Sequence, residues 1–109
     1  MRAEVDGHSM VPALQAGDRV VVVRGLAPRA GDVVAVPDPR RPSRLLVKRV
    51  RSVGADAGLE LAGDNAQAST DSRAFGAVAS SEVVGRVVWR YWPPHRRGPL
   101  ARSSALVVR

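Results

Sequence analysis

The sequence predicts a small, single-domain, mainly β fold with little helix. A length of 109 residues and a hydrophobic content of 45% suit one domain with a modest core. Valine dominates the apolar residues and aromatic residues make up only 4%, and β-branched side chains favour strands. Short apolar runs also alternate with segments rich in Gly, Pro and Asp, as in chains of strands and turns.

Five apolar runs are long enough to form strands, and their spacing indicates a small sheet or barrel. We expect these strands at residues 19–23, 32–36, 44–53, 59–63 and 82–92. The proline-rich segment 37–43 is expected to be a loop, and Gly85 in the longest run is a candidate for a bulge. Helix is expected for at most one turn within residues 9–17, because Ser9 suits a helix cap but Pro12 limits the length of any helix there.

The basic charge of the chain is concentrated near its C-terminus. The net charge is +7, and residues 90–109 contain five arginines and no acid, which leaves +2 for residues 1–89. After Trp92 the sequence continues PPHRRGP, which ends regular structure. We therefore expect a folded domain at residues 1–92 and a basic, flexible tail at residues 93–109. Such a tail can contact nucleic acid or anionic lipid, although a solvated terminus is the more common case.

The composition excludes several kinds of site. The chain has no cysteine, so disulfides, thiolate metal sites and a cysteine nucleophile are ruled out. Two histidines are too few for a histidine-rich metal site, and no metal or cofactor is expected. No stretch approaches the roughly 20 apolar residues of a membrane span, and the N-terminus lacks an apolar signal segment. We expect a cytoplasmic or peripherally membrane-associated protein without a transmembrane segment.

Lys48 is the only lysine beside sixteen arginines, and it lies in the apolar run RLLVKRV. Strand alternation puts Leu46, Lys48 and Val50 on one face, where apolar neighbours would lower the pKa of the amine by removing its hydration. A neutral amine can act as a general base, which a guanidinium cannot. Codon bias, or a lysine whose stem packs while its head reaches water, explains the same residue equally well.

A lysine base needs a hydroxyl to deprotonate, and Ser9 is the best candidate. The nearby Gly7 lets the backbone approach a substrate, and a turn before Ser9 can direct N–H groups at an oxyanion. A Ser-His-Asp triad is disfavoured, because the adjacent His8 would point away from Ser9 and His95 lies in the basic tail.

Three segments, in this order, resemble the type I signal peptidase family of Ser–Lys proteases: GHSMVPALQAGDRVVV, LLVKRV and GDNAQASTDSRAFGAV. The resemblance covers residues 7–92 and implies the coiled, barrel-like β sheets of that family. It implies that Ser9 is the nucleophile and Lys48 the general base, with Ser69 orienting the amine. Gly7 and the Ser9 backbone N–H would form the oxyanion site. The family also cuts after small residues.

The same resemblance implies structural roles for five further residues. Met10 is expected to pack beside the substrate groove without a chemical role. The GDN…DSR box is expected to scaffold a loop near the site, since Asp and Asn suit turns and an Asp–Arg pair can brace a loop. Its matching residues are Asp64, Asn65, Asp71 and Arg73.

Two features point to a particular branch of the family. Only fifteen positions separate Lys48 from Gly63, and the domain ends in GRVVWRYWP. Both resemble the group of proteases that mature nickel-type superoxide dismutase. The resemblance implies a serine endopeptidase that removes the propeptide of a nickel superoxide dismutase precursor.

Three alternatives remain open. The first is a minimal type I signal peptidase that acts on secretory precursors and contacts the membrane peripherally. The second is a self-cleaving repressor-type Ser–Lys domain, which the GDN…DSR box and the missing DNA-binding helices disfavour. The third is an inactive, arginine-rich β-domain that binds nucleic acid. Here the clustered aromatics Trp89, Tyr91 and Trp92 are better explained by strand and core packing than by base stacking, so no nucleic-acid partner is expected.

Overall fold

The computed structural model describes residues 1–5, 7, 10–25, 27–38, 41–56, 58–64 and 77–100, and this part is antiparallel β structure with almost no helix. The mainly β prediction is confirmed. Two short 3₁₀ turns are present, η1 (Ser80–Glu82) and η2 (Pro94–Arg96). The strands are β1 (Arg2–Glu4), β2 (Arg19–Val23), β3 (Val33–Asp38), β4 (Arg41–Val53), β5 (Gly58–Ala62), β6 (Val78–Ala79), β7 (Gly85–Trp92) and β8 (Gly98–Pro99).

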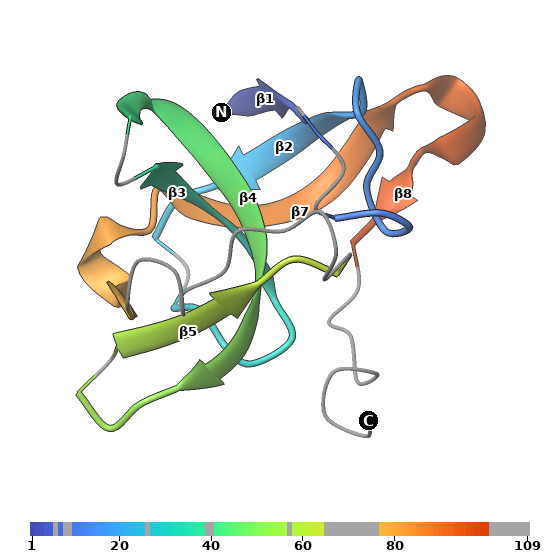
Figure 1. The fold of residues 1–109 in the computed structure, drawn as a ribbon. Helices are drawn as coiled ribbons and strands as arrows, with labels where there is room; N and C mark the ends of the chain where they lie inside the picture. Colours follow the sequence, from blue (N-terminus) through green and yellow to red (C-terminus); the bar gives the residue numbers. More distant parts are fainter. Residues whose placement is uncertain are drawn as a thin grey trace.

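The strands form a single sheet whose order differs from the order in the chain. The order is β1-β2-β7-β3-β4-β5-β6, and β8 pairs with β7. The late strand β7 therefore lies between the early strands β2 and β3 (Figure 1). This insertion brings the C-terminal part of the described chain beside the N-terminal part.

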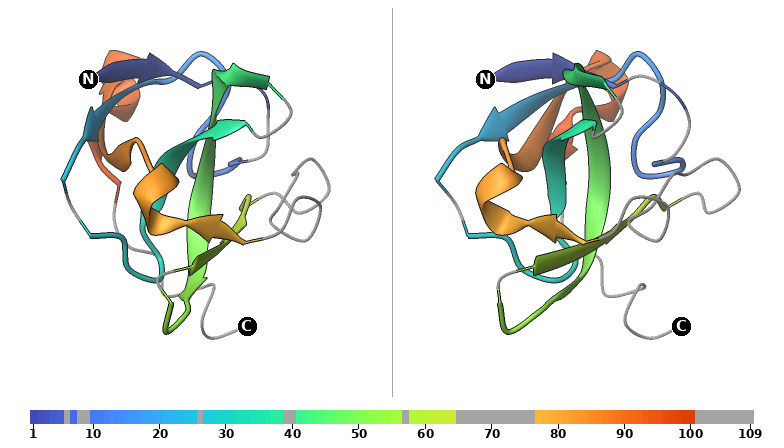
Figure 2. Two further views of the ribbon diagram at one scale, coloured as in Figure 1. Left: turned by 90° about the vertical axis from the view of Figure 1, so that its left-hand side faces the viewer. Right: turned by 60° about the vertical axis from the view of Figure 1, so that its left-hand side comes forward.

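The sheet is strongly coiled (Figures 1 and 2). Two apolar clusters pack against it, and residues of β3 and β4 contribute to both. Strand β3 is apolar on both faces, because its alternate residues enter different clusters. The buried residues of the first cluster are Val5, Met10, Leu14, Val20, Val22, Val33, Ala35 and Val87. Those of the second cluster are Val34, Val36, Leu46, Val50, Leu59, Leu61 and Val78.

All five expected strands are present, but the described residues of the segment 37–43 belong to strands and not to the loop that its prolines predicted. Pro37 and Asp38 end β3, and β4 begins at Arg41. Pro37 pairs with Leu45, beyond the short part of β3 that also pairs with β7. A proline on an open strand side costs no ladder hydrogen bond, so the strand tolerates it.

The prediction of a flexible tail from residue 93 is wrong for the residues up to Leu100, which are ordered against β7. Residues 94–96 form η2, and β8 pairs with Trp89 and Arg90 of β7. The N–H of Leu100 donates to the carbonyl of Val88 at 3.1 Å, and Leu100 packs against the first cluster. The pairing comes from tertiary contacts that a short polar segment does not reveal. Residues 101–109 lie outside the described residues.

Gly85 serves a close approach of backbones, and the bulge predicted there lies elsewhere in β7. The register between β2 and β7 shifts between Arg19 and Val20 and again between Val21 and Val22. A Cβ on Gly85 would lie 2.7 Å from both Val22 Cγ1 and the carbonyl oxygen of Val23. Glycine is therefore needed at this position of β7, which pairs with β3 and lies against the end of β2.

Two turns of the same local form precede β2 and β3. Residues 15–18 (the Asp18 turn) and 29–32 (the Asp32 turn) both end in Ala-Gly-Asp. The glycine φ is 89° in the first and 91° in the second, a conformation that favours glycine. In each turn the aspartate carboxylate accepts the N–H of the first residue at 2.9 Å, and the aspartate N–H donates to that residue's carbonyl at 3.0 Å.

Each turn is also closed onto a valine of a neighbouring segment by two backbone hydrogen bonds. The turn glycine donates its N–H to the valine carbonyl, and the valine N–H donates to the aspartate carbonyl. In the Asp18 turn the valine is Val5, with distances of 2.9 and 2.8 Å. In the Asp32 turn it is Val50, with 2.8 Å for both bonds. The chain therefore enters β2 and β3 in the same way.

Candidate active site

Lys48 is buried in the middle of β4, on the face that alternation predicted. It pairs in register with Val34, and its side chain is only 2% exposed. Leu46 and Val50 on the same face belong to the second cluster, whereas Leu45 and Val47 pack against the first. Burial of this kind strips water from the ammonium form and so favours the neutral amine.

Gly7 lies in the loop that leads from β1 toward β2. Its φ is 82°, in the left-handed region that residues with a Cβ rarely adopt. A Cβ at this position would meet no heavy atom within 4 Å. Backbone conformation, and not lack of space, is therefore the physical reason for glycine here.

The loop after the candidate nucleophile is anchored by two apolar side chains. Met10 and Leu14 are buried in the first cluster, and the N–H of Leu14 donates to the carbonyl of Met10 at 2.9 Å. The bond closes a turn in which the peptide between Val11 and Pro12 is cis, and the helical turn that the sequence allowed within residues 9–17 is not formed in the described part of that range. Met10 is thus a core residue of the loop base.

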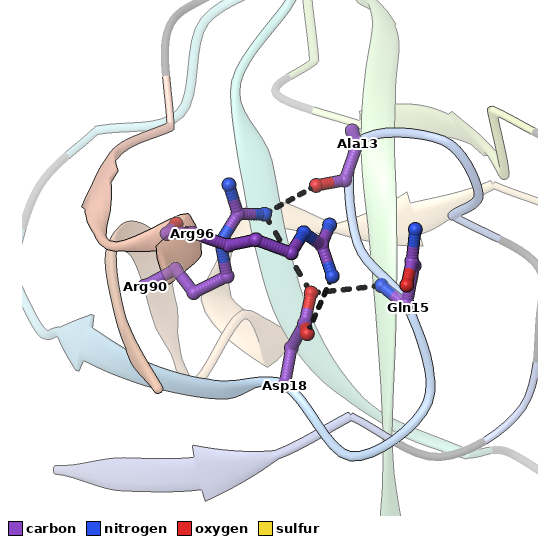
Figure 3. Close-up of polar contacts among 5 residues, drawn as sticks. All are labelled: Ala13, Gln15, Asp18, Arg90 and Arg96. Atoms are coloured by element: carbon purple, nitrogen blue, oxygen red, sulfur yellow. Dashed lines mark hydrogen bonds and ion pairs between the residues drawn. The ribbon is translucent and has the colours of Figure 1, made fainter. Parts of the chain in front are cut away.

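The polar side of the same loop is held by two arginines (Figure 3). Asp18 is 2% exposed, and its Oδ2 accepts the N–H of Gln15 while its Oδ1 accepts from Arg96 Nη1 at 2.8 Å. Arg90 Nη1 lies 3.6 Å from Oδ2 of Asp18 and donates to the carbonyl of Ala13 at 2.7 Å. Arg90 Nε also donates to the carbonyl of Arg96. In the sequence both arginines counted only toward the basic charge near the C-terminus, with Arg96 in the expected flexible tail, so this role was missed.

Asp64, the aspartate of the GDN segment, is bound beside Lys48 by a residue that sequence analysis did not single out. Arg49 donates from Nε to Asp64 Oδ1 at 3.1 Å and from Nη2 to Oδ2 at 2.7 Å. Its Nη1 donates to the carbonyl of Gly31 at 3.0 Å. A lone charge on the otherwise apolar face of Leu45 and Val47 was the available signal. The two-point contact fixes the start of the GDN…DSR box against β4.

The structure thus describes four of the expected site residues, Gly7, Met10, Lys48 and Asp64. Asp64 is hydrogen-bonded to Arg49, the residue next to Lys48. His95, which was rejected as a triad member, is exposed in η2. The remaining expected site residues lie outside the described residues: Ser9, Asn65, Ser69, Asp71 and Arg73.

The aromatic residues near the end of β7 lie mostly on the surface. Trp89 and Trp92 are 43% and 45% exposed, so the expectation that they pack in the core is wrong. Arg19 lies over the Trp92 ring at 5.3 Å, and Arg2 lies over the Tyr91 ring at 5.5 Å. These contacts make an amphipathic surface on β1, β2 and β7.

Within the described ranges, no three His, Cys, Asp or Glu side chains gather closely enough to hold a metal ion. In the same part of the chain, no helix has the length and apolar character needed to cross a bilayer.

Comparison with protein families matches residues 1–57 and 59–92 to the family described as signal peptidase, peptidase S26. The chain therefore belongs to the S26 signal peptidase family, and it is a serine-type peptidase of the signal peptidase kind.

Individual relatives agree with this assignment. Mitochondrial ATP-independent inner membrane protease subunit 1a of Arabidopsis thaliana is 34% identical over 122 residues, covering 88% of this chain and 73% of the relative. Mitochondrial inner membrane protease subunit 1 of Xenopus tropicalis is 32% identical over 92 residues, covering 67% and 55%. Signal peptidase IB of Staphylococcus aureus is 52% identical over 31 residues, covering 28% and 16%.

Proposed function

We propose that the protein is an endopeptidase with a Ser9–Lys48 dyad that removes an N-terminal signal peptide or propeptide from a precursor protein. The observation that carries this proposal is the burial of Lys48, the only lysine of the chain, among the apolar residues of the second cluster. A surface lysine would stay charged and hydrated, whereas a buried amine is suited to accept a proton.

The reaction follows from the chemistry of such a pair. Neutral Lys48 takes the hydroxyl proton of Ser9 as the serine oxygen bonds to the scissile carbonyl carbon. The oxyanion is stabilised by backbone N–H groups at Ser9 and around Gly7, and Ser69 orients the lysine amine. The lysine ammonium then gives its proton to the leaving amine as the peptide bond breaks, and water hydrolyses the acyl-enzyme ester. One lysine thus serves first as the base and then as the acid.

The Arg49–Asp64 contact supports this arrangement. It ties the residue next to Lys48 to the start of the segment that contains Ser69. Because Arg49 also bonds Gly31, the guanidinium has fixed partners on two sides. We expect this contact to limit the movement of the lysine strand relative to the GDN…DSR box.

Two precursor classes fit the proposal. The relatives are named as inner membrane proteases and signal peptidases, which favours a signal peptide or presequence as the substrate. The direct connection of β4 to β5 through residues 54–57 leaves no insertion after Lys48, which favours the nickel superoxide dismutase precursor expected from the sequence. For the first class, the exposed Trp89 and Trp92 beside arginines suit peripheral contact with a membrane surface.

The dyad is tested by Ser9→Ala and Lys48→Arg, each of which should abolish cleavage. Lys48→Arg should also lower the thermal unfolding midpoint, because it buries a guanidinium that cannot lose its charge, but the protein should still fold. Arg51→Lys is the matched control, because Arg51 is an exposed residue of the same strand and should be dispensable. Full activity in Lys48→Arg would contradict a lysine base, since arginine cannot be deprotonated.

The substrate is tested by offering both precursor classes to the purified protein, with and without anionic lipid vesicles. Cleavage of a nickel superoxide dismutase precursor in solution would identify a maturation protease. Cleavage of secretory precursors that requires vesicles would identify a minimal signal peptidase. If neither precursor is cut while the protein is folded, the proposal is wrong.

A further inference from the structure

Arg90 and Arg96 take no part in the proposed proton transfer, yet both reach the loop at residues 10–18, which follows Ser9 in the sequence (Figure 3). Arg90 comes from β7 and Arg96 from η2. Their partners, Ala13 and Asp18, precede them in the chain by 77 and 78 positions. The two arginine side chains are only 15% and 19% exposed. They are therefore partly buried groups with specific partners, and their charge is not part of a solvated tail.

What the arginines hold is the loop itself and not the strand framework. Arg90 donates to the carbonyl of Ala13, and Asp18 relays the contact of Arg96 to the N–H of Gln15. Both contacted backbone groups lie four to six positions after Ser9. In the loop, the N–H of Leu14 bonds the carbonyl of Met10, and these two residues are apolar anchors in the first cluster. Its polar side depends on the guanidinium groups.

The Asp32 turn provides an internal reference. It has the same local hydrogen bonds as the Asp18 turn. Its backbone contacts Arg49 and Val50 of the lysine strand, whereas Arg86 reaches its carboxylate. Its aspartate forms an ion pair with Arg86 of β7 at 3.8 Å, and the Arg86 side chain is 30% exposed. The Arg86–Asp32 pair is thus a looser version of the contacts at the Asp18 turn.

We infer that Arg90 and Arg96 are positioning residues, which act through Ala13 and Asp18 to keep the Ser9 hydroxyl within reach of the Lys48 amine. The inference rests on the proposed Ser9–Lys48 dyad. Proton transfer requires the two groups to be at hydrogen-bond distance, and a misplacement of about 1 Å costs on the order of 100-fold in rate. A loop released on its polar side would lower kcat and leave most substrate contacts unchanged.

The first experiment measures kcat and KM on a fluorogenic precursor peptide with alanine before the scissile bond. Arg90→Met and Arg96→Met keep the apolar stems and should lower kcat by about 10- to 100-fold, with KM changed by less than about twofold. Arg96→Lys keeps the charge at Asp18 and should recover most of the lost kcat. Arg86→Met is the matched control from the same strand, and its kcat should stay within about twofold of wild type.

The second experiment needs no substrate. In a Ser9→Ala background, amide hydrogen exchange is compared at Leu14, Gln15 and Gly17. Arg90→Met and Arg96→Met should speed exchange there by about tenfold or more, whereas Arg86→Met should not. If the exchange changes but the wild-type protein cuts no peptide, the proposed dyad has failed while the loop contact stands.

Several results would overturn the inference. One is an equal loss of kcat in the Arg86 control. Another is a rise in KM alone, which would indicate a substrate contact. A third is a lower unfolding midpoint with unchanged kcat and unchanged local exchange, which would mean that the arginines only stabilise the fold. If a methionine variant does not fold, Arg96→Lys is compared with wild type instead. The inference requires amide exchange in the loop of Arg96→Lys to stay near the wild-type rate, and faster exchange would contradict it.

Discussion

The Asp18 turn and the Asp32 turn have the same sequence ending and the same local hydrogen bonds, but different arginines hold them. At the Asp18 turn, Arg96 bonds the carboxylate at 2.8 Å and Arg90 bonds the loop backbone at 2.7 Å. At the Asp32 turn, Arg86 lies 3.8 Å from the carboxylate, and Arg49 bonds the turn backbone at Gly31. The first set of arginines comes from the C-terminal part of the described chain.

The difference shows that local structure and anchoring have separate origins in this protein. Three letters, Ala-Gly-Asp, are enough to form either turn, because glycine supplies the positive φ and aspartate the internal acceptor. Which arginine reaches the turn depends on the insertion of β7 between β2 and β3. The turn that follows the candidate nucleophile in the sequence is the one with the closer arginine–carboxylate contact.

The largest expected effect is a difference between the two aspartates. Asp18→Ala leaves two mostly buried guanidinium groups without their carboxylate, so the free energy of unfolding should fall by about 3–5 kcal/mol. Asp32→Ala should cost only about 2 kcal/mol, because the more exposed Arg86 can be rehydrated. Urea unfolding followed by circular dichroism measures both. Equal losses would mean that the two turns are anchored equally well.

Gly85→Ala tests the part of β7 that lies between β2 and β3, the strands that follow the two turns. Gly85 pairs with Ala35 of β3, and a Cβ there would lie 2.7 Å from Val22 Cγ1 and Val23 O of β2. The resulting strain should lower the free energy of unfolding by about 1–3 kcal/mol. A variant as stable as wild type, measured by the same urea titration, would contradict a close approach at this position.

The turn glycines should behave alike, in contrast to the aspartates. With φ values of 89° and 91°, Gly17→Ala and Gly31→Ala should each cost about 1–2 kcal/mol, and they should agree within about 0.5 kcal/mol. Thermal unfolding by calorimetry gives both values. A large difference between the two would show that local equivalence of the turns is incomplete.

The smallest effect is expected at Arg19, the residue that directly follows Asp18. Its ion pair with Glu4 spans 3.6 Å between side chains that are 50% and 64% exposed. Arg19→Ala should therefore change the free energy of unfolding by less than about 1 kcal/mol, including the contact with Trp92. A loss as large as that of Asp18→Ala would remove the contrast between buried and exposed arginine contacts.

Much of the fold was predictable because its main strands follow local patterns. The run at 19–23 became β2 with the same bounds, and the alternation around Lys48 correctly gave the buried face of β4. The short strands β1, β6 and β8 were missed, since two or three residues carry no periodicity. The prolines of 37–43 led to the wrong prediction of a loop. Pro37 lies beyond the part of β3 that pairs with β7, and a strand tolerates proline on such an unpaired side.

The site was predictable to a different degree. Lys48 was found from its rarity and its apolar neighbours, and Gly7 has the backbone conformation that suits glycine. Arg49 was missed because its partner Asp64 lies 15 positions away on another strand's end. Arg90 and Arg96 were missed because a run of arginines without acids is typical of a solvated tail.

The sequence by itself determined the five longer strands, the local form of the two Ala-Gly-Asp turns and the burial of Lys48, because each depends on neighbours within a few residues. It also determined membership of the S26 signal peptidase family through motifs in order. Only the tertiary structure decided which carboxylate each arginine meets. Those contacts span up to 78 positions and exist because β7 enters the middle of the sheet, which no local pattern encodes.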